Sequence, residues 1–470
     1  MADGVTTRPL SSFWASLREA LRGSHQDYTQ GSLTRAIFLL AVPMVLEMLM
    51  ESLFAIVDVF WVARLGAESV ATVGLVEAIL TLVYAVGMGL GLSATAMVAR
   101  RVGEKDHEGA AVAGVQAVTL GLVVGIAAGA PCLYAAPHLL RLMGASAAVL
   151  AVGTTYARIT MGGCLVVLLL MLNNAVFRGA GDAAIAMRVL WLSNSINLLL
   201  DPCLIFGLGP FPRLGVTGAA VATFTGRSIG VVYQLYRLSQ GGEHIRIAAR
   251  QVRIHAAVMT RLLRVSLTGI AQMLVPHIAW LSLIRIVSVF GSAALAGYAI
   301  AIRIIVFFIL PSWGLSGAAA TLVGQNLGAQ QPQRAEKSVW KTGIYNALVM
   351  GAVGAFFVAF AGTIIRLFTR DPEIVSVSTA CLRIVSVGNI GYAYEMVMMQ
   401  AFNGAGDTLT PTIVNFFGFI VLEIPLAYVL AISLGMQTQG VSWAITISES
   451  AIPIAMVVLF RRGRWKEKKI

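Results

Sequence analysis

Long apolar stretches recur along the chain from Phe38 to Phe460 and constrain its fold more than any other feature. A helix needs about 20 mostly apolar residues to cross the hydrocarbon core of a bilayer. We count twelve such stretches, centred near residues 50, 84, 122, 164, 196, 226, 274, 308, 348, 389, 421 and 450. The run from Leu165 to Leu172 is apolar on every side, whereas the strands of a membrane barrel alternate apolar with polar residues. The sequence therefore predicts an all-α integral membrane protein with twelve transmembrane helices.

The net charge of +12 would suit a nucleic-acid-binding protein, but its distribution indicates a membrane protein. Hydrophobic residues make up 58% of the 470 and charged residues only 12%. If the N-terminus is cytoplasmic, most of the 34 Lys and Arg residues fall in inner segments, and the outer loops hold only Arg64, Arg141, Arg213, Arg366 and Arg370. The positive-inside rule then predicts both termini in the cytoplasm. We expect a multi-pass membrane protein with no nucleic-acid partner.

The two halves of the chain repeat each other at a constant offset in residue number. The segment Phe177-Arg-Gly-Ala-Gly-Asp182 matches Phe402-Asn-Gly-Ala-Gly-Asp407, and the same offset pairs Gly103 with Gly328. Six helices per copy is an even number, so both copies enter the membrane in the same direction, which is the parallel-repeat layout. Binding sites in such transporters lie at the repeat interface, so we expect two lobes around a cavity that opens alternately to either side.

The repeat also divides the chain into segments. We expect a cytoplasmic N-terminal segment (1–32), a first six-helix lobe (33–236), a cytoplasmic linker (237–259), a second six-helix lobe (260–460) and a basic cytoplasmic tail (461–470). In the N-terminal segment, apolar residues form one helical face, as is typical of a helix lying on the membrane surface: Phe13, Trp14, Leu17 and Leu21. A disordered segment is the alternative there.

Three carboxylates of the first helix are confined to the first copy. Glu47, Glu51 and Asp58 follow one another at spacings of four and seven and so share one helical face. In the second copy the same positions hold Gln272, Pro276 and Leu283. Aligned acids in a membrane helix repel each other unless they face water, cations or bound protons. The pattern therefore predicts an acidic stripe that faces a cavity.

The fifth helix repeats this asymmetry. Asn194, Asn197 and Asp201 share a face, whereas the second copy has Phe419, Leu422 and Leu426. Asp58 lies eight residues before Gly66, and Asp201 lies eight before Gly209, so the two carboxylates have similar depth. If they meet, they share a proton or coordinate a hard cation such as Na⁺ with amide oxygens. The alternative is that Asp201 merely pairs with a neighbouring polar group.

Other intramembrane residues are weaker candidates. Pro202 removes one helical hydrogen bond and can leave the carbonyl oxygen of Leu198 free as one more ligand. The second half contains Glu395, Glu423 and Glu449, which are scattered over different helices with no shared face. Glu423, near the middle of its helix, is the best of these for contacting a cationic substrate. The expected substrate cavity therefore includes Glu47, Glu51, Asn194 and Glu423.

Further motifs complete the pattern: Pro43, Val57-Asp58, Ala96-Met-Val-Ala-Arg-Arg-Val-Gly103 and Leu322-Val-Gly-Gln-Asn-Leu-Gly-Ala329. With the Arg-Gly-Ala-Gly-Asp turn they resemble the multidrug and toxic compound extrusion (MATE) family of cation antiporters, and the similarity runs from about Leu33 to Phe460. The resemblance implies a V-shaped pair of six-helix lobes that expels dyes, antimicrobials or metabolites against an inward proton or sodium gradient.

The resemblance is stronger to the DNA-damage-inducible-type bacterial branch of that family, which implies a protein of the bacterial inner membrane. It implies an ion site in the first lobe made of Asp58, Asn197, Asp201 and Asn174, and a first-helix kink at Pro43 that changes with protonation. The norfloxacin-efflux branch instead carries a seventh-helix Glu. This chain has Pro276 and His277 near that place, so it departs from that branch's cation site in the second lobe.

The expected activity is secondary antiport of organic, mostly cationic compounds, with H⁺ or Na⁺ as the coupling ion, no other cofactor and a monomeric protein. The alternative is a flippase for lipid-linked oligosaccharides, which would place basic residues in the cavity; Arg285 and Arg303 favour it. An enzyme would need a clustered nucleophile, metal ligands or a catalytic dyad. We find no such cluster in the sequence and expect a transporter.

Overall fold

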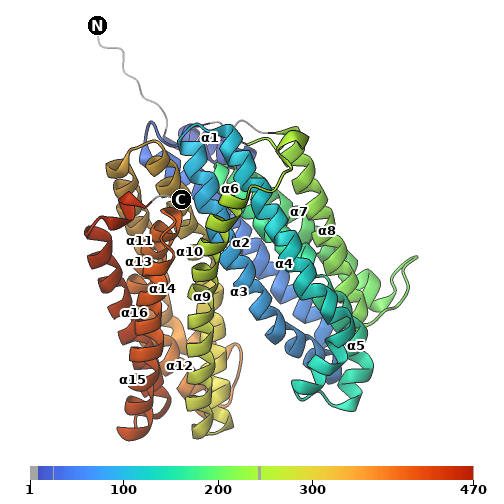
Figure 1. Cartoon of the computed structure of the whole chain (residues 1–470). Helices are drawn as coiled ribbons and strands as arrows, with labels where there is room; N and C mark the ends of the chain where they lie inside the picture. The colour runs from blue at the N-terminus through green and yellow to red at the C-terminus, as the bar shows by residue number, and fades with distance from the viewer. Residues whose placement is uncertain (1–8, 25, 242–244, 469) are drawn as a thin grey trace.

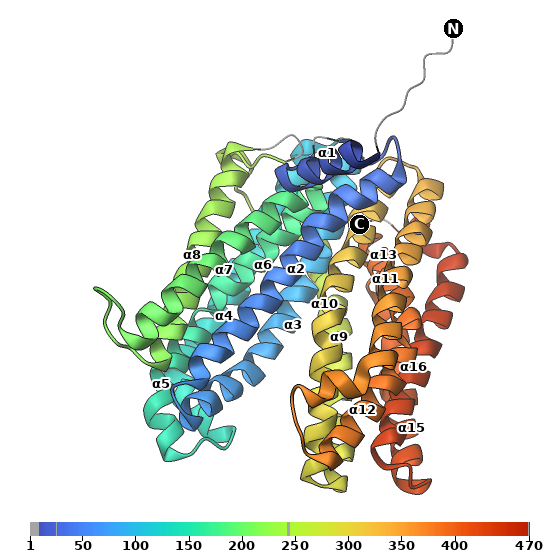
Figure 2. The ribbon, with the colours of Figure 1, turned by 180° about the vertical axis from the view of Figure 1, so that it is seen from behind.

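The chain folds into two bundles of long helices, seen in the computed structural model of residues 9–24, 26–241, 245–468 and 470 (Figure 1). The bundles meet at the end that carries both termini and diverge toward the opposite end, as Figure 2 shows from behind. Residues 1–8 and 25 of the predicted N-terminal segment, 242–244 of the predicted linker and 469 of the predicted tail lie outside the described residues.

The first bundle consists of α2 (Leu33–Ala63), α3 (Ala67–Gly103), α4 (His107–Leu142), α5 (Ala147–Gly162), α6 (Cys164–Ala180), α7 (Ala183–Phe206) and α8 (Val216–Gln240). The second bundle begins with α9 (Ala256–Val287), α10 (Ser292–Gly328), α11 (Pro332–Arg366), α12 (Pro372–Val387) and α13 (Asn389–Gly404). It ends with α14 (Leu409–Asn415), the π-helix η3 (Phe416–Glu423), α15 (Ile424–Tyr428), the π-helix η4 (Val429–Ser433) and α16 (Gln437–Arg461).

These helices make twelve membrane spans, as the apolar stretches predicted. Within the described residues, ten are long and apolar enough to cross a bilayer, counting α5 with α6 and the segment Leu409–Ser433 as one span each. The pair α12 and α13, bent by 54°, makes an eleventh. The twelfth is α8, which has 25 residues and is less apolar. The all-helical fold with two lobes is thus confirmed.

The internal repeat is visible in the helix breaks. Gly163 separates α5 from α6, and Gly388, its counterpart at the repeat offset, separates α12 from α13. Each break divides the fourth span of its lobe at the same place. The duplication therefore extends to irregularities of the backbone.

The lobes touch through a pair of glycines related by the repeat. A Cβ on Gly103 would overlap the backbone of Gln325, and a Cβ on Gly328 would overlap the backbone of Arg100. Arg100 and Gln325 are themselves counterparts at the repeat offset. The two contacts are thus equivalent by a pseudo-two-fold axis that passes between α3 and α10. Only glycine lets the backbones approach this closely.

The ends of the chain lie across this junction. Helix α1 (Pro9–Arg22) runs across the ends of the bundle, with Phe13 and Trp14 exposed (Figure 2). In the tail, the Lys468 carbonyl accepts a hydrogen bond from Arg100 Nη2 in the first lobe at 2.6 Å. The Lys468 ammonium is 3.2 Å from an Asp407 carboxylate oxygen in the second lobe. The tail therefore connects the two lobes.

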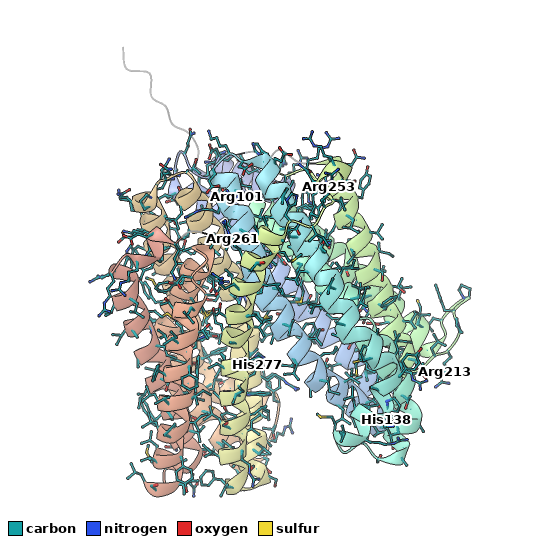
Figure 3. All side chains as sticks on the ribbon, in the orientation of Figure 1. Arg101, His138, Arg213, Arg253, Arg261 and His277 are labelled. Carbon is teal, nitrogen blue, oxygen red and sulfur yellow. The ribbon has the colours of Figure 1, made fainter. Side chains whose placement is uncertain are left out.

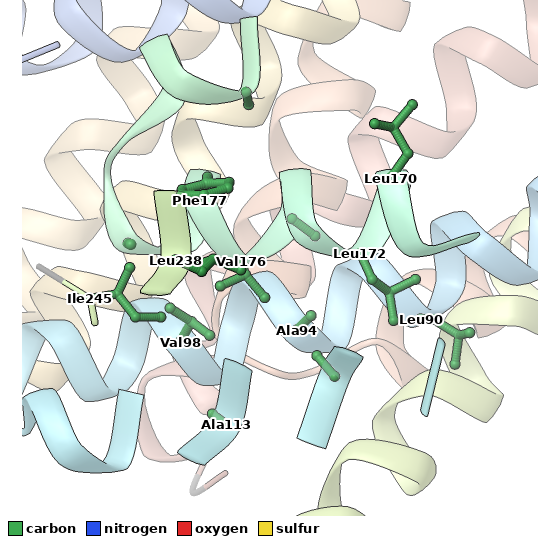
Figure 4. Packing of buried hydrophobic residues seen from close by; sticks show 14 of the residues in the cluster. Leu90, Ala94, Val98, Ala113, Leu170, Leu172, Val176, Phe177, Leu238 and Ile245 are labelled. Carbon is green, nitrogen blue, oxygen red and sulfur yellow. The ribbon is translucent and has the colours of Figure 1, made fainter. Parts of the chain in front are cut away.

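Apolar packing within the first lobe includes the segment between the lobes. Figure 4 shows Leu90, Ala94 and Val98 of α3 packed beside Leu172 and Val176 of α6. Ile245 belongs to the same buried cluster. Helix α8 ends at Gln240 and helix α9 begins at Ala256, so the segment between the two helices is shorter than the predicted linker 237–259. The residue that caps the end of α8 is Gly241, whose φ is +84°.

Candidate functional site

A cavity of about 220 Å³ lies among α2, α3, α5, α6 and α8. It is lined by helices of the first lobe, whereas the sequence predicted a cavity between the lobes. Its charged lining is three acids and one arginine, Glu51, Asp58, Glu77 and Arg227. Aromatic side chains line the wall, among them Phe54, Tyr84, Tyr156 and Phe224. The cavity thus combines aromatic surface with charges of both signs.

Asp58 and Asp201 lie close enough for their charges to interact. Asp58 lines the cavity, and Asp201 on α7 is fully buried. One carboxylate oxygen of each has no hydrogen-bond partner among the described residues, and neither acid is in an ion pair with another residue of the described chain. Such buried carboxylates carry a large desolvation penalty unless a proton or a cation neutralises them.

Asn197 links Asp201 to the cavity. In the amide orientation that satisfies both of its polar ends, Asn197 donates to Asp201 Oδ2 at 2.8 Å and accepts from the Thr223 amide at 2.9 Å. Thr223 itself lines the cavity. The sequence placed Asn197 with Asp201, and the structure adds Thr223 as the connection to the cavity.

Arg227 is the cation of the cavity. Its Nη2 lies 3.7 Å from Glu51 Oε1, and its Nη1 donates to the Tyr84 hydroxyl at 3.3 Å. Asn194 donates to the other Glu51 oxygen at 3.0 Å. Glu51 therefore has an ion-pair partner, whereas Arg227 also attracts Asp58 electrostatically but forms no ion pair with it.

Glu47 and Asn174 form a separate polar network. Glu47 Oε1 accepts from Arg178 Nη1 at 3.1 Å and from Asn174 Nδ2 at 3.3 Å. The Asn174 oxygen accepts in turn from Gln234 at 2.7 Å. Neither Glu47 nor Asn174 is among the residues that line the cavity. The structure thus groups these two with Arg178, apart from the Asp58 and Asp201 carboxylates.

The remaining predicted site residues are dispersed. Pro43 is buried inside α2, which continues through it without a break, and Pro202 lies inside α7 directly after Asp201. Glu423 lies in the second lobe, at the end of the π-helix η3.

Replacing Arg178 by Met is expected to destabilise the protein by about 3 kcal/mol, because it leaves the Glu47 carboxylate buried without its cation. Glu47 is only 1% exposed. Thermal unfolding of the purified protein would show a lower midpoint. The double variant Arg178→Met with Glu47→Gln should recover much of the loss. Equal stability of the single variant and the parent would show that the pair contributes nothing.

The MatE family profile matches the chain twice, over residues 43–203 and 268–429. The matched segments cover more than half of the chain, and their starts are separated by the offset of the internal repeat. The chain belongs to the MatE family. It is therefore a membrane transporter of the multidrug efflux type and not an enzyme.

Relatives and solved structures of this MATE transporter agree with that assignment. It is 26% identical to the probable multidrug resistance protein NorM of Thermotoga maritima, covering 92% of this chain and 93% of the relative. A structure described as the outward-facing conformation of a multidrug resistance MATE family transporter matches with a TM-score of 0.87 and 27% identity, over 94% of this chain and 98% of that one. A Pyrococcus furiosus transporter of the MOP superfamily, described as having a binding pocket of reverse polarity, matches with a TM-score of 0.86 and 28% identity, over 94% and 98%.

Sequence reasoning missed part of the cavity of this MATE transporter. Arg227 was overlooked because the two copies were compared only along their first and fifth helices. Its counterpart in the second copy is Ile452, and Glu77 corresponds to Ile302. The comparison that selected Asp58 and Asp201 would thus have selected both residues if it had covered the charged residues of all six helices.

Proposed function

We propose that this MATE transporter is an antiporter that exports organic, mostly cationic compounds in exchange for protons or sodium ions. The observation that carries the proposal is the pair Asp58 and Asp201, two buried carboxylates that form no ion pair in the described chain, next to a cavity with aromatic walls. A coupling ion that neutralises this pair weakens its attraction for a cationic substrate. Binding of the ion from outside then favours release of the substrate there.

The proposed orientation places both termini in the cytoplasm of a bacterium. Arg101, Arg253 and Arg261 lie toward the end with the termini, and His138 and Arg213 lie near the other end (Figure 3). An excess of Arg and Lys on the cytoplasmic side is the usual arrangement. The helices diverge at the opposite end, so this orientation corresponds to an outward-facing state.

Transport of anionic or zwitterionic compounds, including lipid-linked oligosaccharides, is the second candidate function. Arg227 in the cavity favours it, as does the likeness to the transporter described as having a pocket of reverse polarity. Three acids share the cavity with this one arginine, and Glu51 is the acid paired with it. We therefore place cations first.

The decisive experiment follows a fluorescent organic cation into inverted vesicles or proteoliposomes under an imposed proton or sodium gradient, with Asp201→Asn in parallel. Uptake driven by one gradient and lost in the variant would support antiport and identify the coupling ion. Absence of transport of any cation by the correctly inserted protein would favour the second candidate function.

A further inference from the structure

Three glutamates of the second lobe come together although they are far apart in sequence. Glu395 on α13 and Glu423 on η3 are 3% and 4% exposed, and Glu449 on α16 is half-buried. Their carboxylates lie close enough to repel one another. The sequence-based prediction that they are scattered is therefore wrong.

Helix contacts explain how Glu395 meets Glu449. A Cβ added at Gly391 would lie 2.9 Å from the Glu449 carbonyl oxygen, so α13 and α16 are in backbone contact at this level. Glu395 follows Gly391 by four residues and so lies on the same face of α13, one turn further along. The Glu395 side chain thus faces α16 beside Glu449.

The π-helix brings in the third carboxylate. A Cβ added at Gly418 would overlap the side chain of Ile452 on α16. Glu423 follows Gly418 by five residues, which is about one turn of a π-helix. On α16, Glu449 precedes Ile452 by three residues, which is about one turn of an α-helix. Glu423 and Glu449 therefore face each other across the contact between η3 and α16. Insertions of π-helix often mark functional sites.

No cation of the described chain compensates this charge. None of the three glutamates forms an ion pair with a described Lys, Arg or His. The Oε2 atoms of Glu395 and Glu423 are buried and have no hydrogen-bond partner in the described chain. Three ionised carboxylates in these surroundings would carry a large desolvation penalty.

A hydroxyl group from a fourth helix points to a ligand. Tyr298 on α10 is 2% exposed, its hydroxyl has no hydrogen-bond partner among the described residues, and it interacts electrostatically with Glu423 and Glu449. The other titratable neighbours are Tyr392 on α13, beside Glu395 and Glu449, and Cys381 on α12, beside Tyr298. Every titratable group found around the cluster is thus acidic or neutral.

We propose that Glu395, Glu423 and Glu449, with the Tyr298 hydroxyl, form a proton-binding site in the second lobe. Buried carboxylates that repel one another and have no cation nearby cannot all ionise, so at least one holds a proton at neutral pH. A proton needs only one carboxylate oxygen, which suits a place where α13 and α16 are in backbone contact. At the repeat offset the first lobe has Leu170, Leu198 and Phe224, so this site is not a copy of the one at Asp58 and Asp201. The inference extends the proposed coupling to a second lobe, but it stands on different residues.

The test measures protonated carboxyl groups directly. Infrared difference spectra of the purified full-length protein, taken between neutral and alkaline pH, report the C=O stretch of buried carboxylic acids. The background variant is Asp58→Asn with Asp201→Asn, which removes the first-lobe pair. We expect a band to remain at neutral pH, to titrate at alkaline pH, and to be lost or shifted by at least one of Glu395→Gln, Glu423→Gln and Glu449→Gln. The control Glu373→Gln, at the exposed start of α12, should leave it unchanged.

A band that is absent from the background variant, or unchanged by all three substitutions, would overturn the proposal. The unsubstituted protein gives a second measurement that needs no variant. Dicyclohexylcarbodiimide reacts with protonated carboxyls in apolar surroundings, and mass spectrometry should locate it on this cluster at neutral pH and find less at alkaline pH. No modification of the cluster at either pH would also contradict a proton there. Both readouts are independent of transport, so they distinguish failure of this site from failure of Asp58 coupling.

Discussion

Asp58→Asn is expected to abolish ion-driven export while the protein still inserts and folds. The substitution removes the ionisable group that lines the cavity beside Asp201 and keeps its shape. Each charge that crosses the membrane is worth about 2.3 kcal/mol per 100 mV, enough to concentrate a monovalent compound tens of times. Without coupling, the ratio of substrate concentrations across the membrane should approach one.

The measurement is accumulation of a fluorescent cation in inverted vesicles with matched protein amounts. Glu68→Gln provides the control, because Glu68 is an exposed acid in the first turn of α3, and it should retain full accumulation. Undiminished accumulation by Asp58→Asn would refute the coupling role of that carboxylate.

Gly103→Ala and Gly328→Ala should each disrupt the junction between the lobes. The added methyl group has no free space, because it meets backbone atoms of the other lobe rather than a flexible side chain. Overpacking of this kind costs about 1–3 kcal/mol or more. We expect a lower unfolding midpoint in both variants and, since the two contacts are related by the pseudo-two-fold axis, losses of similar size.

Gly74→Ala is the matched control for this pair. Gly74 lies in the same helix α3, and a Cβ there would have no neighbour within 4 Å. Its unfolding midpoint should equal or exceed that of the parent, because Ala favours helix by about 1 kcal/mol over Gly. Destabilisation by Gly74→Ala equal to that of Gly103→Ala would mean that the junction is not the cause.

Much of the fold followed from the sequence because the bilayer imposes helix length and the repeat imposes symmetry. The break at Gly163 and its partner Gly388 fall at the centres of the predicted fourth and tenth spans. The proximity of Asp58 and Asp201 followed from counting residues to the outer ends of their helices. Depth along a helix is thus predictable from sequence, because the rise per residue is fixed.

Side-chain partners were less predictable, and the reasons are local. Arg178 lies in the last turn of α6, and its guanidinium pairs with Glu47 of α2, a contact between helices that spacing along one helix does not predict. The contact of Glu423 with α16 depends on η3, because a π-helix has more residues per turn than the roughly 3.6 assumed in a helical projection. Sequence periodicity alone gave no sign of that change.

The symmetric contacts of Gly103 and Gly328 also bear on how the chain arose. In an isologous dimer, residue i of one subunit meets residue j of its partner, and j meets i in return. In this chain Gly103 contacts Gln325, the counterpart of Arg100, and Gly328 contacts Arg100. The two copies within one polypeptide therefore show the same reciprocal pattern. A homodimer of six-helix chains would form the same junction with a single glycine in each subunit. The surface that joins the lobes is therefore one that can predate the fusion of their genes.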